Sequence, residues 1–297
     1  MDKVFIARLG GGFRSLEMVG GVELLLDVPR LEEKLIIKAL RGAGFELRIT
    51  NVKYEPLTWD RPAEISLVRT ISMLRAAYSA SVREASGART INCSKAILIS
   101  GDKILTLSAL KSSGIDFPES VVALNGEAAE RAGELLGYPL IDKPPIGSWG
   151  RLVTLIDNPK TLRSVIEHRQ FYQSQALKTH ILQRYVKAGC SDLRILVLGG
   201  EVLGAIRRTA TNGDWRSNVA RGGVVERAEL CEELEELAIR VASAIGGEFL
   251  GVDVFEEDGR YLVNEVNGVP EFKGFMEATG VDVPGILARY LKEVLRR

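Results

Sequence analysis

Apolar and polar positions alternate with two different periods along the chain from residue 22 onward. The mainly apolar segment VELLLDV at 22–28 is the first predicted strand. A helix is predicted over about 30–43, because apolar side chains recur there at three- and four-residue spacing. These positions are Leu31, Leu35, Ile36 and Leu40, and Pro29 precedes them. Strands at 46–52 and 64–70 and a helix through 71–86 complete a small α/β layer that ends near residue 95.

The rest of the chain continues this alternation of strands and helices. Helices are predicted at about 102–113, 126–137, 159–170, 229–245 and 283–296. Strands are predicted within 139–144, 151–156, 177–187, 192–200 and 201–209, and a β-hairpin at 252–267. The pattern indicates a mixed α/β (α+β) protein. We expect an N-terminal extension at 1–21, in which Met18 offers an alternative start, a first α/β domain at 22–95, a central subdomain at 96–186 and a C-terminal subdomain at 187–297.

The hairpin VDVFEEDGRYLVNEVN at 252–267 carries three oxygen-bearing side chains within its apolar runs. They are Asp253, Glu265 and Asn267. Two carboxylates and an amide oxygen on one face would suit a hard cation such as Mg²⁺. An acidic hairpin face exposed to water would have the same composition, so the register of the two strands matters.

The register depends on the length of the turn. A two-residue turn at 258–259 would place the first carboxylate on the opposite face from the second, because side chains alternate along a strand. A three-residue loop at 257–259, with its glycine left-handed, would pair Glu256 with Arg260 and bring all three polar side chains to one face. We therefore predict the three-residue loop.

Composition and charge narrow the possible classes of protein. The 297 residues are 46% hydrophobic and 26% charged, as in an ordinary globular protein, and 39 basic residues balance 39 acidic ones. This balance gives no support to a nucleic-acid or membrane-surface partner. The cysteines Cys93, Cys190 and Cys231 form no C-x-x-C motif, so we expect no zinc site or disulfide framework and a reducing, cytoplasmic location. Only two histidines are present, which disfavours a histidine triad.

The loop PPIGSWGRL at 144–152 is the second candidate for chemistry. Gly147 and Gly150 allow the backbone to approach a ligand closely, and several N–H groups there could converge on an anion. Lys143 lies in the preceding strand, and Lys103 begins a predicted helix, where a phosphate would be attracted. A glycine-rich hairpin turn and two surface lysines, with Asp102 as a helix cap, are the alternative interpretation.

Arginines gather in the last third of the chain. Asp192 and Arg194 begin a strand, Arg207 and Arg208 end the next one, and Trp-Arg-Ser-Asn follows at 215–218. Arginines that face one cleft can hold phosphoryl oxygens, although each could equally form a surface ion pair. Together with the lysines, the glycine loop and the polar hairpin, they supply what phosphoryl transfer from Mg·ATP requires.

The order of these motifs resembles that of the ATP-grasp ligases, and most closely their RimK-like branch. The segments IDKPPIGSWGRL and NEVNGVPEFKGFMEATG resemble the ligases that act on the amino-group carrier protein LysW in lysine and arginine biosynthesis. The similarity runs from about residue 22 to residue 295. It implies an ATP- and Mg²⁺-dependent carboxylate–amine ligase that uses one or two magnesium ions and forms an acyl phosphate.

The resemblance also implies roles for individual residues. The ATP-binding set would be Lys103, Lys143, Gly147, Ser148, Trp149, Gly150, Arg151, Gln183, Arg184, Tyr185, Val186, Asp192, Arg216, Ser217 and Asn218. Arg194 and Arg208 would stabilise the transferred phosphoryl group, and Asp253, Glu265 and Asn267 would bind Mg²⁺. The sequence departs from its relatives at Arg184, where glutamate is usual, and this makes the assignment of 183–186 as the adenine-binding hinge less direct.

Substrate choice is expected at Gly274 and Phe275. Relatives that take glutamate resemble this sequence in having Gly-Phe at that point, and bifunctional relatives share it, whereas relatives dedicated to α-aminoadipate have Asn followed by Ser or Thr. Phe275 could shorten a pocket by one methylene, which discriminates by only about 1–3 kcal/mol. It could also be a core residue beneath the hairpin.

The expected partners follow from the same resemblance. They are the acidic carrier LysW, bound through a basic patch that includes Arg151, Arg221 and Lys273, a small amino acid, and further copies of the chain in a homo-oligomer. No nucleic acid or membrane is expected. Three alternatives remain open: an α-aminoadipate–LysW ligase of lysine biosynthesis, a RimK-like ligase that adds glutamate to another protein tail, and a regulatory domain that binds ATP without turning it over.

Overall fold

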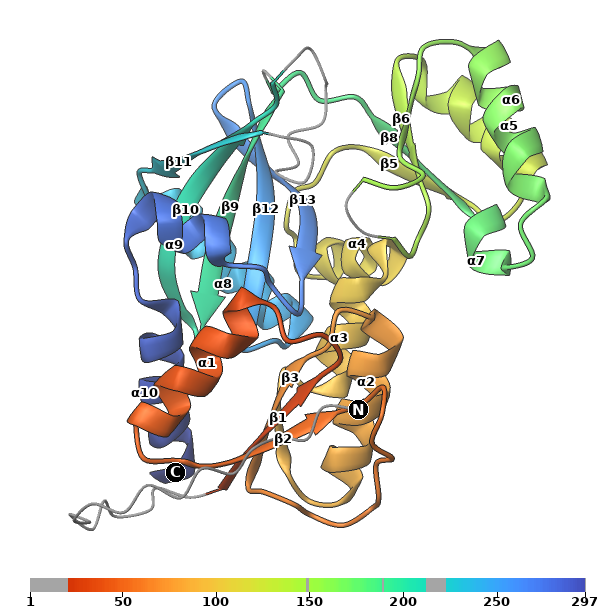
Figure 1. Ribbon diagram of the computed structural model, residues 1–297. Helices are drawn as coiled ribbons and strands as arrows, with labels where there is room; N and C mark the ends of the chain where they lie inside the picture. The colour runs from red at the N-terminus through yellow and green to blue at the C-terminus, as the bar shows by residue number, and fades with distance from the viewer. Residues whose placement is uncertain (1–20, 148–149, 189, 212–222, 297) are drawn as a thin grey trace, which may run out of the picture.

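The computed structural model describes residues 21–147, 150–188, 190–211 and 223–296, and it contains three β-sheets with helices packed against them (Figure 1). The N-terminal layer comprises β1 (Gly21–Leu26), α1 (Leu31–Gly42), β2 (Glu46–Asn51), β3 (Ile65–Arg69), α2 (Met73–Ala85) and β4 (Arg89–Ile91). Its four strands are parallel, in the order β2-β1-β3-β4. Strands β1 and β3 are buried along almost their whole length, as is usual for the central strands of a parallel sheet covered on both faces.

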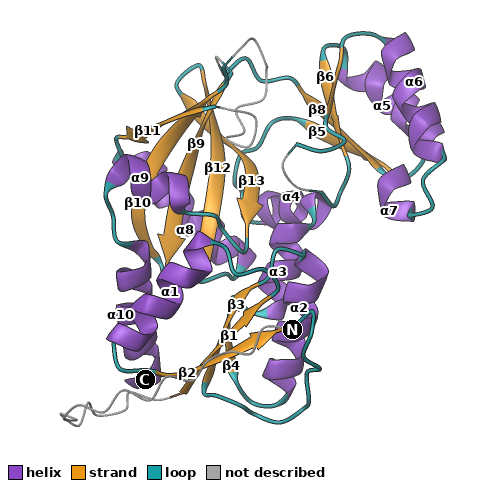
Figure 2. Cartoon of the chain, viewed as in Figure 1, coloured by secondary structure: helices purple, strands orange, loops and turns teal. Residues whose placement is uncertain are grey.

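The central part carries a four-stranded sheet in the order β5-β8-β6-β7. Two helices, α3 (Ser94–Gly101) and α4 (Lys103–Ser112), lead into it. Its other elements are β5 (Ser120–Ala123), α5 (Gly126–Leu136), β6 (Leu140–Lys143), β7 (Thr154–Ile156), α6 (Pro159–Gln170), α7 (Gln175–Lys178) and β8 (His180–Arg184). Figure 2 shows α5 and α6 side by side against this small sheet, set apart from the rest of the chain.

The C-terminal part is built on a five-stranded antiparallel sheet in the order β11-β10-β9-β12-β13. Its elements are β9 (Ser191–Leu198), β10 (Glu201–Thr209), β11 (Val224–Ala228), α8 (Glu232–Ile245), β12 (Phe249–Glu257), β13 (Arg260–Asn267), α9 (Lys273–Thr279) and α10 (Val283–Arg296). The apolar stripe of α8 packs on one face of the sheet, as its helical spacing requires.

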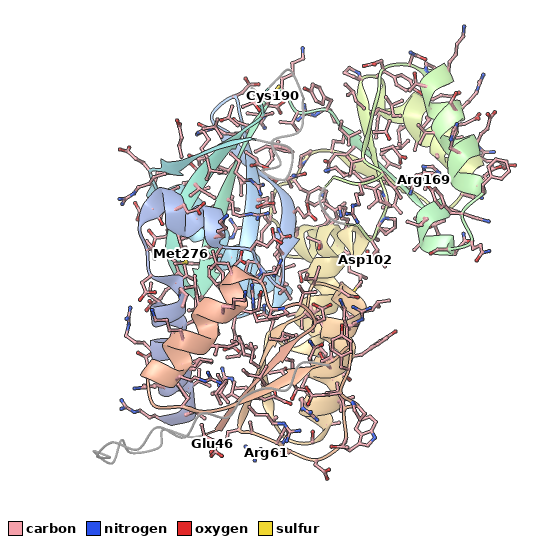
Figure 3. All side chains as sticks on the ribbon, viewed as in Figure 1. Glu46, Arg61, Asp102, Arg169, Cys190 and Met276 are labelled. Atoms are coloured by element: carbon pink, nitrogen blue, oxygen red, sulfur yellow. The ribbon has the colours of Figure 1, made fainter. Side chains whose placement is uncertain are left out.

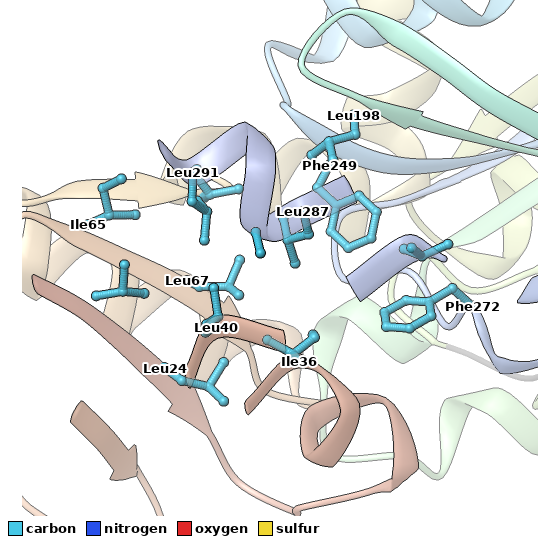
Figure 4. Close-up of a cluster of buried hydrophobic side chains, with 14 of the residues drawn as sticks. Leu24, Ile36, Leu40, Ile65, Leu67, Leu198, Phe249, Phe272, Leu287 and Leu291 are labelled. Carbon is cyan, nitrogen blue, oxygen red and sulfur yellow. The ribbon is translucent and has the colours of Figure 1, made fainter. Parts of the chain in front are cut away.

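The last helix, α10, returns to the N-terminal layer and packs against it. Helix α10 packs against α1, and their leucines share one core with β1, β3 and several phenylalanines, among them Phe249 and Phe272 (Figure 4). Phe45 and Phe275 belong to the same core. The C-terminal range therefore contributes to the core of the N-terminal layer as well as to its own.

Polar contacts fix the N-terminal layer to the end of the β12–β13 hairpin. Arg69, buried at the end of β3, donates to the carbonyl oxygen of Pro270 at 2.9 Å and is paired with Glu33 at 3.0 Å. The Asn92 amide spans to the carbonyl oxygens of Phe249 and Gly268 at 2.6 and 2.7 Å. Since these groups are buried, the contacts hold the hairpin in a defined position relative to β1 and β3.

The predicted elements are confirmed in the main, with several omissions. The helix expected at 102–113 begins at Lys103, and a separate helix, α3, precedes it, because Asp102 has an extended backbone that interrupts the two. The sequence analysis also missed β4, β5, α7, β11 and α9, all of seven residues or fewer. Within the ranges that the structure describes, no helix has the length and apolar character needed to span a membrane.

Candidate active site

The hairpin turn differs from the predicted one, but the three polar side chains still lie on one face of the hairpin. Glu257 pairs with Arg260, so the turn has two residues, and Asp258 and Gly259 both have positive φ, at 51° and 73°. This is the geometry of the type I′ turn, which Asp-Gly favours. The expected three-residue loop is therefore wrong.

A β-bulge restores the expected facing of the polar side chains. Val254 pairs with Val263, whereas Asp253 pairs with Glu265, so Asn264 is the extra residue on β13. The insertion shifts the register by one and places the two carboxylates directly opposite each other. Asn267 joins them, since its side-chain nitrogen lies 3.4 Å from Asp253 Oδ2.

The carboxylate of Asp253 is buried between two arginines. Arg194 donates Nε and Nη2 to its two oxygens at 2.7 and 2.8 Å, and Arg208 Nη2 lies 3.0 Å from Oδ2. Burial alone would raise the pKa of Asp253, but the two guanidinium groups outweigh it and hold the pKa below its ordinary value. Arg208 is also bound by Asp192 at 2.5 and 2.7 Å, so buried charges of both signs meet here.

The two predicted lysines approach the same site from the central part of the chain. Lys143 donates to Gln183 Oε1 at 2.6 Å and to Asn264 Oδ1 at 2.8 Å, and burial lowers its pKa to about 8. Lys103 donates to the carbonyl oxygen of Gly147 at 2.9 Å and lies 3.4 Å from Glu265. Each lysine thus links two of the segments that the sequence analysis selected separately.

Helix α4 presents Lys103 at its N-terminus, where Asp102 is the cap (Figure 3). The Asp102 carboxylate accepts from the backbone of Ile104 and Leu105 at 2.8 and 3.2 Å. The alternative interpretation was therefore right about the cap, while Lys103 itself points to the glycine loop and the hairpin rather than to open solvent.

These groups line a narrow cavity of about 90 Å³ between the central and C-terminal sheets. Its lining includes the following predicted residues: Lys103, Lys143, Gly147, Gly150, Arg151, Gln183, Arg184, Tyr185, Val186, Asp192, Asp253 and Glu265. Apolar walls come from Ile141, Val153 and Phe255. Phe255 and Ile141 lie two residues from Asp253 and Lys143 on their strands, so the two-residue period could have identified both.

Arg184 makes a specific contact at the edge of this cavity. Its guanidinium bridges Glu257, at the end of β12, with distances of 3.2 and 2.6 Å, and Glu257 also accepts from the backbone nitrogen of Lys187. The hydrogen bond to Glu257 raises the pKa of Arg184. The arginine that departs from the family pattern thus has a partner on the facing sheet.

A second cavity of about 480 Å³ adjoins the first. The two share Gly147, Asp253 and Glu265, and Arg194, Arg208 and Asn267 line the second. Its remaining wall comes from the N-terminal layer, from α3, from Ile146 and from residues 266–269 and 271 at the end of the hairpin. The predicted phosphoryl-stabilising arginines and metal ligands therefore stand where the two cavities meet.

The donor set of the hairpin fits a magnesium ion. The described residues contain no group of three or more His, Cys, Asp or Glu side chains that could hold a metal ion. The candidate donors of the hairpin are instead two carboxylates, of Asp253 and Glu265, and the amide oxygen of Asn267. Such oxygen donors are what Mg²⁺ prefers, and Mg²⁺ keeps several waters or phosphate oxygens besides a few carboxylates. In this arrangement Arg194, Arg208 and Lys103 neutralise the two carboxylates.

Other predicted residues are not brought to either cavity. Phe275 is buried in the core shared with α10, so the packing alternative describes its position, and Gly274 likewise lines neither cavity. Their role in substrate choice stays a prediction. Ser148, Trp149, Arg216, Ser217, Asn218 and Arg221 lie outside the described residues.

Comparison with known proteins assigns the class. The model of the RimK-like ATP-grasp domain matches residues 100–291, and the chain belongs to this family. It is therefore an ATP-grasp ligase of the ADP-forming carboxylate–amine type, and ATP-grasp ligases use ATP and Mg²⁺.

The names of individual relatives specify a substrate, whereas the family model gives only the class of enzyme. The chain is 46% identical over 276 residues to the glutamate–LysW ligase ArgX of Sulfurisphaera tokodaii, which covers 92% of this chain and 98% of that one. It is 34% identical over 288 residues to the α-aminoadipate–LysW ligase LysX of the same organism, covering 94% and 100%. A RimK-domain ATP-grasp protein of Sphaerobacter thermophilus, known from its crystal structure, matches with a TM-score of 0.73 and 26% identity over 91% of this chain and 98% of that one.

Proposed function

We propose that this protein is an ATP- and Mg²⁺-dependent ligase that joins the α-amino group of glutamate to the γ-carboxyl group of the C-terminal glutamate of LysW, in arginine biosynthesis. The observation that supports this most is the identity of 46% over nearly the whole of a glutamate–LysW ligase, against 34% for an α-aminoadipate–LysW ligase. The Gly274-Phe275 pair favours the same substrate.

The narrow cavity is the proposed site of ATP. Gln183 to Val186 border the adenine, Lys103 and Lys143 contact the phosphates, and the loop that contains Gly147 and Gly150 covers them. Asp192 holds Arg208 in place, and Ser148, Trp149, Arg151 and the segment 216–218 complete the set. Asp253, Glu265 and Asn267 are the proposed holders of Mg²⁺, which, when bound, neutralises charge on the phosphates.

The reaction proceeds in two displacements. A carboxylate oxygen of the carrier attacks the γ-phosphorus of ATP, the bond to the β-phosphate oxygen breaks, and ADP leaves an acyl phosphate on the carrier. The amine of glutamate then attacks the acyl carbon, phosphate leaves with the C–O electron pair, and the amine proton passes to water. Arg194 and Arg208 stand where they can stabilise the oxygens that gain charge.

The partner assignments are part of the same proposal. An acidic carrier would be attracted by exposed basic residues near the cavities, and Arg151 lines the first cavity while Lys273 is exposed at the start of α9. We further propose a homo-oligomer and a cytoplasmic location, and the domain limits 22–95, 96–186 and 187–297.

Trapping with hydroxylamine tests the first displacement. With LysW, Mg·ATP and hydroxylamine but no glutamate, we expect a hydroxamate on the carrier and one ADP for each hydroxamate, because hydroxylamine attacks the acyl phosphate in place of the amine. Colorimetric detection and the intact mass of the carrier measure it. ADP release without a modified carrier would contradict LysW as the acceptor.

The lowered pKa of Lys143 predicts how nucleotide affinity depends on pH. Its pKa in the folded protein is about 8, against 10.5 for an ordinary lysine, so the free protein loses this positive charge as the pH rises through 8. Bound phosphate favours the protonated lysine, so binding above pH 8 must take up a proton. We expect the affinity for Mg·ATP to be constant below pH 7.5 and to fall by up to about tenfold per pH unit above 8.

Calorimetric titration at several pH values measures this dependence. The variant Lys143→Arg keeps its charge over this range and serves as the control, with an affinity that changes little from pH 7 to 9.5. Equal pH dependence in the two proteins would show that Lys143 does not contact the phosphates.

A further inference from the structure

Lys143 is held differently from the other cations of the site. The two arginines where the cavities meet are paired with Asp253, and Lys103 lies 3.4 Å from Glu265. The side chain of Lys143 is buried, yet among the described residues no carboxylate lies within 4.0 Å of its ammonium group. Its hydrogen-bond partners there are two neutral amide oxygens. A buried charge without a counterion is unusual, because burial is costly unless the charge is compensated.

The first amide belongs to the central sheet. Gln183 lies on β8, next to β6, and its Oε1 accepts from Lys143 at 2.6 Å. Its Nε2 donates to Ser120 Oγ at 2.9 Å, and that hydroxyl donates in turn to the carbonyl oxygen of Pro118 at 2.7 Å. Since the serine proton is used by the carbonyl, the serine oxygen has to accept from the amide nitrogen. The amide oxygen of Gln183 is therefore fixed toward the lysine.

The second amide belongs to the C-terminal sheet and comes from the β-bulge. Val263 and Val266 both pack in the core of this sheet, whereas Asn264 and Glu265 between them both line the first cavity. Two consecutive residues on one face are possible only because the bulge interrupts the alternation of side chains. Asn264 Oδ1 thereby accepts from Lys143 at 2.8 Å, across the boundary between β6 and β13 (Figure 1).

Neutral acceptors suit a lysine that binds an anion. An ammonium group has three donors, and the two amides occupy two of them, which leaves one for a phosphoryl oxygen. A carboxylate in the place of either amide would cancel the positive charge and repel the phosphate. The amide oxygens satisfy the buried donors and leave the net charge in the cavity.

We propose that Asn264 is a positioning residue for the phosphates of ATP: with Gln183 it holds the ammonium group of Lys143 through neutral oxygens, which fix its direction without cancelling its charge. This role rests on the proposed function, in which Lys143 contacts the phosphates. Because Asn264 precedes Glu265 on β13, the contact also sets the lysine of the central sheet relative to a proposed holder of Mg²⁺. Asn264 acts through Lys143 and needs no contact of its own with ATP.

A double-mutant cycle tests whether Asn264 acts through Lys143. Asn264→Leu keeps the size of the side chain and removes the acceptor oxygen. In calorimetric titrations of the full-length chain with Mg·ATP at pH 7, we expect it to weaken binding about 5- to 20-fold, and Lys143→Met to weaken it about 100-fold. In the Lys143→Met background, Asn264→Leu should change the affinity less than about twofold, because the group that it positions is absent.

The pH dependence of the affinity gives a second readout, which a purely structural role would not move. Two other charged groups face Lys143, Glu265 from β13 and Lys103 from α4. Asn264→Asp adds a carboxylate beside the ammonium group and raises the pKa of Lys143 above its value of about 8, so the fall in affinity should begin about one pH unit higher. Asn264→Leu removes a hydrogen bond to the charged form, so the fall should begin at a lower pH.

Asn158 provides the matched controls. It caps α6, where its side chain accepts from the backbone nitrogen of Thr161 at 3.0 Å, and it is exposed and lines neither cavity. Asn158→Leu and Asn158→Asp make the same two chemical changes, and the first removes a helix cap, which costs stability. Both variants should keep the wild-type affinity and pH dependence, so a loss of stability alone is separated from positioning.

The outcomes separate this role from the proposed function. If Lys143→Met weakens binding but Asn264→Leu does not, or if Asn264→Leu weakens it equally in both backgrounds, Asn264 has no positioning role and the proposed nucleotide site stands. The same holds if the two Asn264 variants shift the pH dependence in one direction. If Lys143→Met binds Mg·ATP as tightly as the wild type, the proposed phosphate contact is wrong, and the role of Asn264 falls with it. Transfer to LysW is decided by hydroxamate trapping, because calorimetry with Mg·ATP does not involve the carrier.

Discussion

Replacing Glu265 with glutamine should lower the rate of ligation by about 10³-fold or more and leave the fold intact. Under the proposed function Glu265 would help to hold the Mg²⁺ that neutralises charge on the phosphates, and such a contribution is worth several kcal/mol in the transition state. Glu265 lies opposite Asp253, its side chain is 31% exposed, and its ion-pair partner in the described part of the chain is Lys103 at 3.4 Å. Loss of such a partly exposed pair costs little stability.

Asp253→Asn should also abolish ligation, but at a cost to the fold. From the sequence alone, we expect that Asp253 and Glu265 can each be replaced without loss of the fold, because each would be a metal ligand and not part of the hydrophobic core. The structure shows that Asp253 is buried between Arg194 and Arg208, and removal of one partner from buried ion pairs destabilises by about 3–5 kcal/mol. Urea denaturation of the two variants measures the contrast.

The pH dependence of unfolding provides a second measure of Asp253. Its pKa is lower in the folded chain than in the unfolded chain, so its charge stabilises the fold above the unfolded pKa, and this contribution is lost as the pH falls through the folded value. The Asn variant should lack this part of the acid dependence. Full activity in Glu265→Gln, or wild-type stability in Asp253→Asn, would contradict the roles assigned to the hairpin.

Replacing Arg194 with glutamine should reduce kcat by about 10²- to 10³-fold with a small change in the KM for ATP, because a donor aimed at developing charge acts mainly in the transition state. Asp253 would remain paired with Arg208 at 3.0 Å, so the fold should survive this change. Steady-state rates of ADP release with LysW and glutamate measure both constants.

Arg207→Gln is the matched control for Arg194. Arg207 lies on β10 next to Arg208, but it pairs with Glu256 at 2.8 Å on the exposed side of the sheet and lines neither cavity. Its variant should keep wild-type rates. Equal losses in the two variants would mean that the charge of the sheet, rather than the position of Arg194, controls the reaction.

Local sequence patterns were sufficient to predict much of the fold and of the candidate site. Hydrophobic periods predicted the long helices and the buried strands, and Lys143 was selected because it lies in a strand next to the glycine loop. The polar hairpin was recognised because three oxygen-bearing side chains interrupt its apolar runs. These features depend on residues that are close together in the chain, so they can be recognised in a single sequence.

Features that depend on tertiary contacts were not predictable. The bulge at Asn264 shifts the register of β13, and neither the turn chemistry nor the alternation of side chains reveals it. It also turns Asn264 to Lys143, a contact that the sequence analysis missed. The burial of Phe275 requires α10 to return to the first layer, which pairs segments far apart in the chain.

The most direct test of the central claim is the intact mass of LysW after incubation with the purified protein, Mg·ATP and either glutamate or α-aminoadipate. The account predicts a carrier that is heavier by one glutamyl unit, and ADP formed in equal amount. A carrier heavier only after incubation with α-aminoadipate, or unmodified with both acids, would contradict it.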